Sequence, residues 1–338
     1  MNQEGEIEVM TVEETTEVSQ VDTSQTMSIA EVHDLTSEII RECQRVIVGK
    51  IDILRDTMIA FLSNGHVVLE GVPGLAKTYM ARTFASILGC AFKRIQLTVD
   101  TLPSDILGSN VFNQKSGEFW FRKGPVFANL VLADEINRCP PKSQSALLEV
   151  MEERQVSTEG VTRKLPLPFL IIATQNPVEQ EGTYPLPEAQ LDRFMFRLVL
   201  DYPTPSEEAE VIRRKHQGEA TDLRVLGGPS AIVRMQNACK TVYLDEDVIN
   251  YIRDIVVRTR NDPQILLGGS PRASLVLMSG SKTRAAMLGR DYVIPEDVRK
   301  LCVQTLNHRL VMKPEAELEG LSVDRIVSKI LGEVDCPK

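Results

Sequence analysis

The sequence contains no long uninterrupted hydrophobic run. Its apolar candidates are short segments such as residues 169–173, well below the roughly 18 residues that a membrane-spanning helix needs. The N-terminus also lacks the basic and apolar segments of a secretory signal. We therefore expect a cytoplasmic protein without a membrane span.

Metal-binding and disulfide patterns are also missing. The six cysteines include no C-x-x-C pair, and the chain has only four histidines. Zinc sites and disulfide frameworks require closer spacing of their ligands or partners. We expect reduced thiols, most of them buried, at positions 43, 90, 139, 239, 302 and 336.

The first forty residues contain no lysine or arginine. They hold ten of the 47 acidic residues, so the net charge of −9 comes from this leading segment and the rest of the chain is nearly neutral. A neutral body has no general electrostatic attraction for nucleic acid. Residues 1–27 also lack aromatic residues, and we expect them to form a disordered acidic tail that is solvated rather than docked.

From about residue 28 the sequence alternates between helical periodicity and short β-branched runs. Near-continuous apolar runs separated by helices are typical of parallel strands that are buried on both faces. Strands are predicted at residues 66–69, 94–98, 129–133, 169–174 and 196–200. The sequence therefore predicts an α/β domain with a parallel sheet over residues 28–203. Strand-like runs become rare after this point, which predicts a smaller helical domain over residues 204–338.

A glycine-rich loop follows the first predicted strand and opens a helix. Residues 70–78 read EGVPGLAKT, which matches the phosphate-binding pattern G-x-x-x-x-G-K-[ST] except that Ala76 replaces the second glycine. The backbone N–H groups of such a loop surround phosphates, Lys77 adds a positive charge, and the Thr78 hydroxyl is a ligand for Mg²⁺. The strand–loop–helix setting predicts a nucleotide site rather than a chance turn.

Polar side chains follow two further strands. Asp134 and Glu135 end the strand at 129–133, and Gln175 and Asn176 end the strand at 169–174. Because ligands of open α/β sheets bind at the carboxyl ends of strands, Asp134, at the tip of a neighbouring strand, is expected to reach Mg²⁺ and Glu135 to polarise the attacking water. An amide at the other strand tip can hold the γ-phosphate or that water. Arg193 is a candidate arginine finger, the alternative being a surface ion pair.

The sequence resembles the MoxR family of AAA+ ATPases in four segments, GVPGLAKT, LVLADEINR, ATQNPVEQEGTYPLPEAQLDRF and GGSPRA. The resemblance runs from about residue 28 to the C-terminus and is most specific between residues 66 and 197. It implies an α/β P-loop NTPase core of AAA+ type, followed by an all-α lid, in a protein that hydrolyses ATP with Mg²⁺. It also implies assembly into a ring, usually a hexamer, with ATP bound between neighbouring subunits.

The resemblance assigns roles to individual residues. The catalytic roles fall on Glu135, the sensor 1 residue Asn176, the trans-acting finger Arg193 and the sensor 2 residue Arg272, and the metal ligands are Thr78 and Asp134. The residues that contact nucleotide are Val48, Gly49, Gly71, Val72, Pro73, Gly74, Leu75, Ala76, Lys77, Thr78 and Tyr79. Two alternatives stay open: Gly49 only turns the chain, and Arg272 only caps its helix.

Two hairpins are predicted within the α/β domain, with turns at residues 113–117 and 159–160. In MoxR relatives, the corresponding insertions face the ring pore or its surface. We expect Trp120, the single tryptophan, to pack under its hairpin rather than to grip a substrate.

The leading functional hypothesis is an ATP-driven remodeller of protein complexes. The resemblance implies client or adaptor proteins, including partners with von Willebrand factor A domains. The alternative is a nucleic-acid motor of the helicase-like AAA+ group, but acids are interspersed among the hairpin bases and no aromatic–basic stripe is present. Nucleic acid is therefore not the expected partner. A scaffold that binds ATP without turnover is disfavoured by Glu135, since a pure switch needs no carboxylate that activates water.

Overall fold

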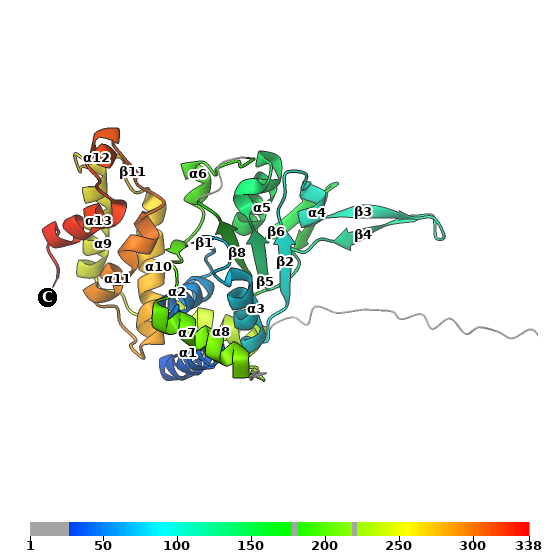
Figure 1. Ribbon diagram of the computed structural model, residues 1–338, viewed down its shortest axis with the longest axis horizontal. Coiled ribbons are helices and arrows are strands. Elements are labelled where there is room, and N and C mark those ends of the chain that lie inside the picture. The colour runs from blue at the N-terminus through cyan, green and yellow to red at the C-terminus, as the bar shows by residue number, and fades with distance from the viewer. Residues whose placement is uncertain (1–26, 178–181, 218–221, 338) are drawn as a thin grey trace, which may run out of the picture.

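The computed structural model of the protein describes residues 27–177, 182–217 and 222–337. At its centre is a parallel five-stranded sheet with the strand order β2-β5-β8-β1-β9, covered by helices (Figure 1). The strands are β1 (Val67–Glu70), β2 (Phe92–Gln96), β5 (Leu130–Asp134), β8 (Leu170–Gln175) and β9 (Phe196–Val199). The predicted α/β class and all five strands are confirmed, with boundaries shifted by one or two residues. The predicted tail lies outside the described residues, apart from Met27.

In the three central strands β5, β8 and β1, successive residues pack into two different cores on the two faces of the sheet. In β5, Leu130 and Leu132 belong to the larger core, whereas Val131 and Ala133 belong to the smaller one. This burial on both faces is what the continuous apolar runs predict. The helices that precede or connect the strands are α1 (Ile29–Gln44), α2 (Ile51–Leu62), α3 (Lys77–Ile87), α4 (Pro103–Leu107), α5 (Pro141–Glu153) and α6 (Glu188–Leu191).

The spatial order of the strands differs from one sequence expectation. Strand β8 lies between β1 and β5, so the strand that carries Asp134 is not the direct neighbour of the strand before the glycine-rich loop. Parallel strands are joined by crossovers, and the order of strands along the chain does not fix their order in the sheet. All three strands run in the same direction, so their carboxyl ends still meet at one edge.

The chain after the sheet is mostly helical. Its elements are α7 (Pro205–Gln217), α8 (Pro229–Lys240), α9 (Glu246–Arg260), β10 (Ile265–Leu267), α10 (Pro271–Met287), α11 (Pro295–Leu306), β11 (Val311–Met312), α12 (Pro314–Leu318) and α13 (Val323–Glu333). Helices α9, α12 and α13 stand away from the sheet (Figure 1). Helix α11 contacts the edge strand β9, and α8 packs on α2, where Gln236 Nε2 donates to Phe61 O at 2.8 Å. None of the described helices is both long and apolar enough to cross a bilayer.

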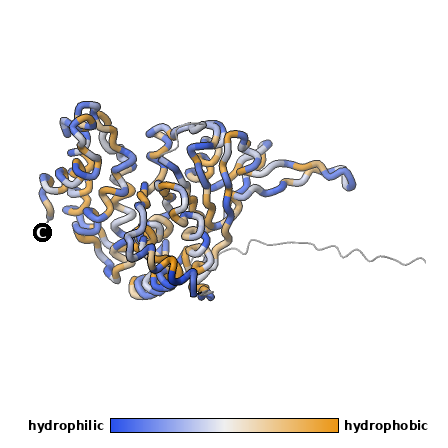
Figure 2. Tube along the Cα trace, viewed as in Figure 1, coloured by the Kyte–Doolittle hydropathy of each residue, from blue (hydrophilic) through white to orange (hydrophobic). Residues whose placement is uncertain are grey.

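Both predicted hairpins are present, as β3 (Gly108–Asn113) with β4 (Glu118–Lys123), and β6 (Gln155–Thr158) with β7 (Val161–Lys164). The first projects from the body, and Figure 2 shows hydrophobic residues along it and a hydrophilic tip. Trp120 is 51% exposed on this hairpin, so the prediction that it packs beneath the hairpin is wrong. A two-stranded ribbon that projects into solvent has no second layer to cover it. Nearer the base of this hairpin, the Cζ atom of Arg163, from the other hairpin, lies 3.9 Å from the centroid of the Phe121 ring.

Candidate nucleotide site

The loop between β1 and α3 forms an open cradle. Gly74 and Ala76 have the left-handed φ values of 88° and 56°, which turn the chain back toward the start of α3. No described atom lies within 4 Å of the position that a Cβ on Gly74 would take. Helix α3 has no side-chain cap and no acidic residue in its first turn, so its first N–H groups are available to an anion. This arrangement fits the phosphates of a nucleotide.

Lys77 extends across the base of this loop. Its Nζ lies 2.6 Å from Gly71 O and 3.4 Å from Gln175 O, which places the ammonium group between the ends of β1 and β8. Gly71 is required here by close packing, because a Cβ at this position would lie 2.8 Å from Leu200 O. The positive charge is therefore held at the edge of the sheet where the phosphates would lie.

Asp134, at the end of β5, is buried and has three partners. Its Oδ1 accepts a hydrogen bond from Thr174 Oγ1 at 2.6 Å, and its Oδ2 accepts from Arg94 at 2.7 and 2.9 Å. Thr78 Oγ1 lies 3.4 Å from the same Oδ2. No group of three or more His, Cys, Asp or Glu side chains in the described ranges could hold a metal by itself. Thr78 and Asp134 therefore fit a Mg²⁺ ion that takes its remaining ligands from phosphate and water, as Mg²⁺ commonly does.

Glu135 has a left-handed backbone conformation with φ of 60°, which is uncommon for a residue with a side chain. Its N–H donates to Thr174 Oγ1 at 2.8 Å, so one hydroxyl binds both consecutive acids. Its carboxylate accepts from Gln96 Nε2 at 3.0 Å and forms an ion pair with Arg138 at 3.4 Å. The side chain is thus anchored next to, but separate from, the carboxylate of Asp134.

Two cavities flank the loop. The first, of about 320 Å³, is mostly apolar and is lined by Val48, the loop residues Gly74 to Ala76, and Tyr79, among others. Gly49 turns the chain at its rim with a left-handed φ of 67°, a conformation that residues with a side chain rarely adopt, so the backbone conformation explains this glycine. The second cavity, of about 490 Å³, lies at the ends of β1 and β8, and Asn176 lines it. An apolar cavity beside a phosphate cradle fits a nucleotide base.

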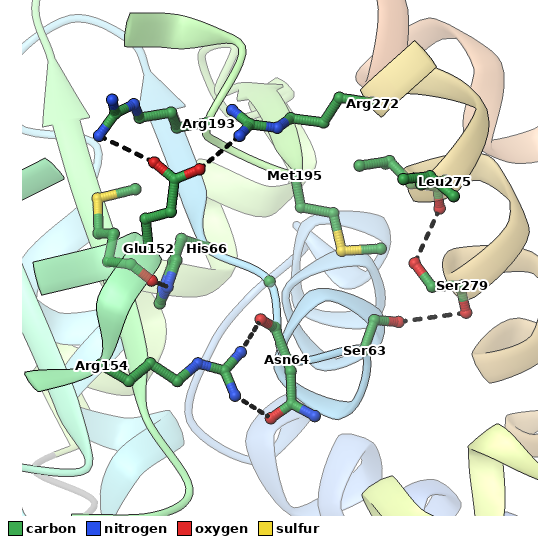
Figure 3. A pocket seen from close by; sticks show the side chains of 13 residues that line it. Ser63, Asn64, His66, Glu152, Arg154, Arg193, Met195, Arg272, Leu275 and Ser279 are labelled. Atoms are coloured by element: carbon green, nitrogen blue, oxygen red, sulfur yellow. Dashed lines mark hydrogen bonds and ion pairs between the residues drawn. The ribbon is translucent and has the colours of Figure 1, made fainter. Parts of the chain in front are cut away.

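Arg193 and Arg272 lie together, and neither lines either of these cavities. Each binds one carboxylate oxygen of Glu152 in α5, Arg193 at 3.1 Å and Arg272 at 2.6 Å, as Figure 3 shows. They line a third cavity of about 270 Å³ whose lining residues are different from those of the other two. Arg272 therefore contacts α5 rather than the end of its own helix, and both guanidinium groups remain partly exposed.

Several residues of this network were not identified from the sequence. Arg94 and Gln96 alternate with the buried Ile95 along β2, and Gln96 is in register with Asp134, so polar residues at alternate positions near a strand end were the available signal. Thr174 and Gln175 are the polar residues at the end of the otherwise apolar strand β8, which gives a similar signal. No sequence signal identified Glu152, because its partner Arg272 lies 120 residues further along the chain.

Comparisons with known proteins agree with this geometry. The family model for the ATPase family associated with various cellular activities (AAA) matches residues 66–196, and a model for the AAA lid domain matches residues 257–330. The chain is 43% identical to Chaperone MoxR1 of Mycobacterium tuberculosis, over 91% of this chain and 84% of that protein. This chain belongs to the MoxR family of AAA+ ATPases.

Two further comparisons extend over nearly the whole chain. The Bacillus subtilis protein YeaC, which is uncharacterised, is 46% identical over 91% of this chain and 96% of its own length. The crystal structure of a proposed ATPase from Cytophaga hutchinsonii superposes with a TM-score of 0.86 at 42% identity, covering 92% of this chain and 97% of that one. The AAA core and lid of this MoxR-family member thus share their arrangement with a solved structure.

Proposed function

We propose that this MoxR-family protein binds ATP with Mg²⁺ between β1 and α3 and hydrolyses it. The observation that supports this most directly is the meeting of Lys77, Asp134 and Glu135 at one edge of the sheet, beside the open cradle at Gly74. The apolar cavity at Val48 and Tyr79 takes the adenine base. The remaining predicted loop residues, Gly71, Val72, Pro73, Leu75 and Ala76, supply backbone N–H groups and shape.

Each polar residue has a distinct part in the proposed reaction. Lys77 neutralises phosphate charge, and Thr78 and Asp134 hold Mg²⁺, which supplies further charge neutralisation at the phosphates. Glu135 orients the attacking water and accepts its proton, with Thr174 fixing its backbone. Asn176, at the end of β8, orients the same water or the γ-phosphate from the cavity that it lines.

The charge that develops on the γ-phosphate is offset by a neighbouring subunit. Arg193 and Arg272 lie at a partly exposed site whose lining residues differ from those of the chain's own nucleotide cavities. This supports the use of Arg193 in trans within a ring, which we propose to be a hexamer, and extends the same use to the sensor 2 residue Arg272. An arginine that acts in this way raises turnover by about 10³–10⁵-fold in related phosphoryl transfer. Residues 28–203 form the nucleotide domain and residues 204–338 the lid in this proposal.

The energy of hydrolysis is used to remodel protein complexes. The chaperone name of the Mycobacterium tuberculosis relative supports this role. We propose that the client or adaptor proteins of this chain include partners with von Willebrand factor A domains, as the family resemblance implies. A nucleic-acid motor is not favoured by the hairpins. Arg163 lies over Phe121 and Lys123 lies over Phe127, so two of their bases already contact aromatic rings of the same chain.

Phosphate release and ATP binding by two variants test the proposed activity. Lys77→Ala should lose ATP binding, because the main positive partner of the phosphates is gone. Glu135→Gln should bind ATP normally and hydrolyse it very slowly, because the amide retains the shape but does not accept a proton. Single-stranded DNA should not stimulate the wild-type protein. Hydrolysis by Glu135→Gln at the wild-type rate would contradict the role given to Glu135.

A further inference from the structure

Arg309 is a buried arginine immediately after α11, in the helical part of the chain. The side chain is only 1% exposed, yet it lines neither of the two nucleotide cavities. Burial lowers the pKa of Arg309 to about 10, so it remains positively charged at neutral pH. A buried cation is costly unless it is paired and fully hydrogen-bonded. The hydrogen-bond acceptors of the Arg309 guanidinium therefore identify the segment of the chain that this residue positions.

Nearly all of these groups lie on the segment that carries Arg193. Arg309 Nε donates to Asp192 Oδ1 at 2.7 Å, and Nη2 donates to Asp192 O at 2.9 Å and to Phe194 O. Nη1 donates to Met195 O at 3.1 Å and to Thr305 O. One guanidinium thus fixes the backbone directly before and directly after Arg193.

Asp192 continues this connection into helix α10. Its carboxylate accepts a hydrogen bond from Ser270 Oγ, at 3.1 and 3.3 Å to its two oxygens. Ser270 is the N-cap residue of α10, and Arg272 follows two residues later. Arg193 and Arg272 then meet again at Glu152 (Figure 3). The two arginines are therefore joined at their backbones through Asp192 and at their side chains through Glu152.

Both arginines depend in this way on the part of the chain that follows the sheet. Arg309 and Ser270 lie in that part, whereas Asp192 and Glu152 belong to the α/β part. A lysine at position 309 would keep the positive charge but has a single nitrogen, which does not form the fork that binds Asp192, Phe194 and Met195 together. The geometry requires an arginine.

We propose that Arg309 is a positioning residue for the arginine finger. It fixes the position of the Arg193 backbone. Through Asp192 and Ser270, it also fixes the position of the start of α10, the helix that carries Arg272. The lid of one subunit thereby controls the arginines that are delivered to the nucleotide of the next subunit. This inference rests on the proposed function, in which Arg193 acts in trans.

Steady-state ATP hydrolysis by Arg309→Lys gives the first test. We expect kcat to fall about tenfold or more while the KM for ATP changes by less than about threefold, since the variant's own nucleotide cavities are untouched. Arg290→Lys is the matched control: the guanidinium of Arg290 also forms an ion pair with a carboxylate, that of Asp297, and among the described residues its hydrogen-bond partners are Asp297 and Tyr292 rather than residues 192–195. The control should keep the wild-type kcat. An unchanged kcat for a folded Arg309→Lys protein would overturn the proposal.

Mixing experiments show in which subunit Arg309 acts. Arg309→Lys mixed with Lys77→Ala should gain activity, because an intact finger from the second chain meets an intact loop in the first. Arg309→Lys mixed with Arg193→Ala should gain none, because neither chain delivers a working finger. A gain in this second mixture would show that Arg309 serves its own nucleotide site, and the proposal would be wrong. Lack of gain in a mixture of Arg193→Ala with Lys77→Ala would instead show that the trans role of Arg193 itself is wrong.

Ser270→Ala covers the case in which Arg309→Lys does not fold. Ser270 is only half-buried, so the loss of its hydroxyl leaves the packing intact while it breaks the bond to Asp192. We expect a smaller fall in kcat, of about two- to fivefold, with the same mixing behaviour. Wild-type kcat in Ser270→Ala, or a gain when it is mixed with Arg193→Ala, would contradict the proposal by itself.

Discussion

At the scale of single residues, Thr174 connects the two acids of the proposed ATPase site. Its hydroxyl donates to Asp134 and accepts from the N–H of Glu135, which has a left-handed backbone conformation. An uncommon conformation at a functional residue persists only where neighbouring groups hold it. Thr174 is one such group, and it follows four apolar residues near the end of β8.

Thr174→Val removes this hydroxyl and keeps the shape of the side chain. We expect kcat for ATP to fall about ten- to hundredfold, because Glu135 loses its fixed position relative to the water. The matched control is Thr57→Val, at a buried threonine that bonds only to Ile53 O within α2. Both variants should lose a similar amount of stability in urea titrations. Equal kcat values in the two variants would contradict the role of Thr174.

His66, next to the cavity of Arg193, predicts a dependence of stability on pH. Its Nδ1 accepts from Ile171 N at 3.0 Å and its Nε2 therefore donates to Met151 O, so the ring is neutral in the fold. Burial lowers the pKa of His66 to about 4. Between pH 6.5 and 4 the unfolded chain thus binds a proton that the native chain does not, and the free energy of unfolding falls as the pH falls through this window.

Urea unfolding of the wild type and of His66→Gln at pH 7 and pH 4.5 measures this contribution. The difference in unfolding free energy between the two proteins should shrink at pH 4.5, by on the order of 3 kcal/mol at most. The comparison cancels other groups that titrate in both proteins, such as Asp56, whose pKa burial raises to about 7. A difference that is independent of pH would show that His66 does not titrate in this way.

At the scale of secondary-structure elements, the strands were predictable and their environment was not. Apolar runs and turn residues located all five sheet strands and both hairpins, because burial on two faces leaves a direct mark on local sequence. The exposure of Trp120 was not predictable, since the same alternation describes a ribbon that packs on a body and one that projects from it. Local pattern specifies an element, whereas its neighbours depend on distant parts of the chain.

The projecting hairpin predicts a contrast between two phenylalanines. Phe119, on β4, is 72% exposed, whereas Phe169, just before β8, is 1% exposed within the smaller core. Phe169→Ala should lower the free energy of unfolding by about 3–5 kcal/mol, and Phe119→Ala by less than about 0.5 kcal/mol. Urea titrations of the two variants measure these values. A large loss in Phe119→Ala would show that the hairpin folds back onto the body.

At the scale of the whole molecule, the phosphate-binding residues and the arginines occupy different sites of one chain. Motifs close together in sequence, such as Lys77 with Thr78 and Asp134 with Glu135, could be predicted because each depends on one strand end. The cluster of Arg193, Arg272 and Glu152 could not, because it joins segments up to 120 residues apart. Arginines that lie outside the chain's own nucleotide cavities are what the proposed function requires, because there the site is shared between two copies.

Hydrolysis by mixtures of Arg193→Ala and Lys77→Ala chains tests this central claim most directly. Each variant alone should hydrolyse ATP very poorly, the first for lack of a finger and the second for lack of a phosphate-binding lysine. Mixed rings contain interfaces where an intact Arg193 faces an intact loop, so activity should appear on mixing and be greatest near equal amounts. Activity that stays at the level of the separate variants at every mixing ratio would contradict a nucleotide site shared between subunits.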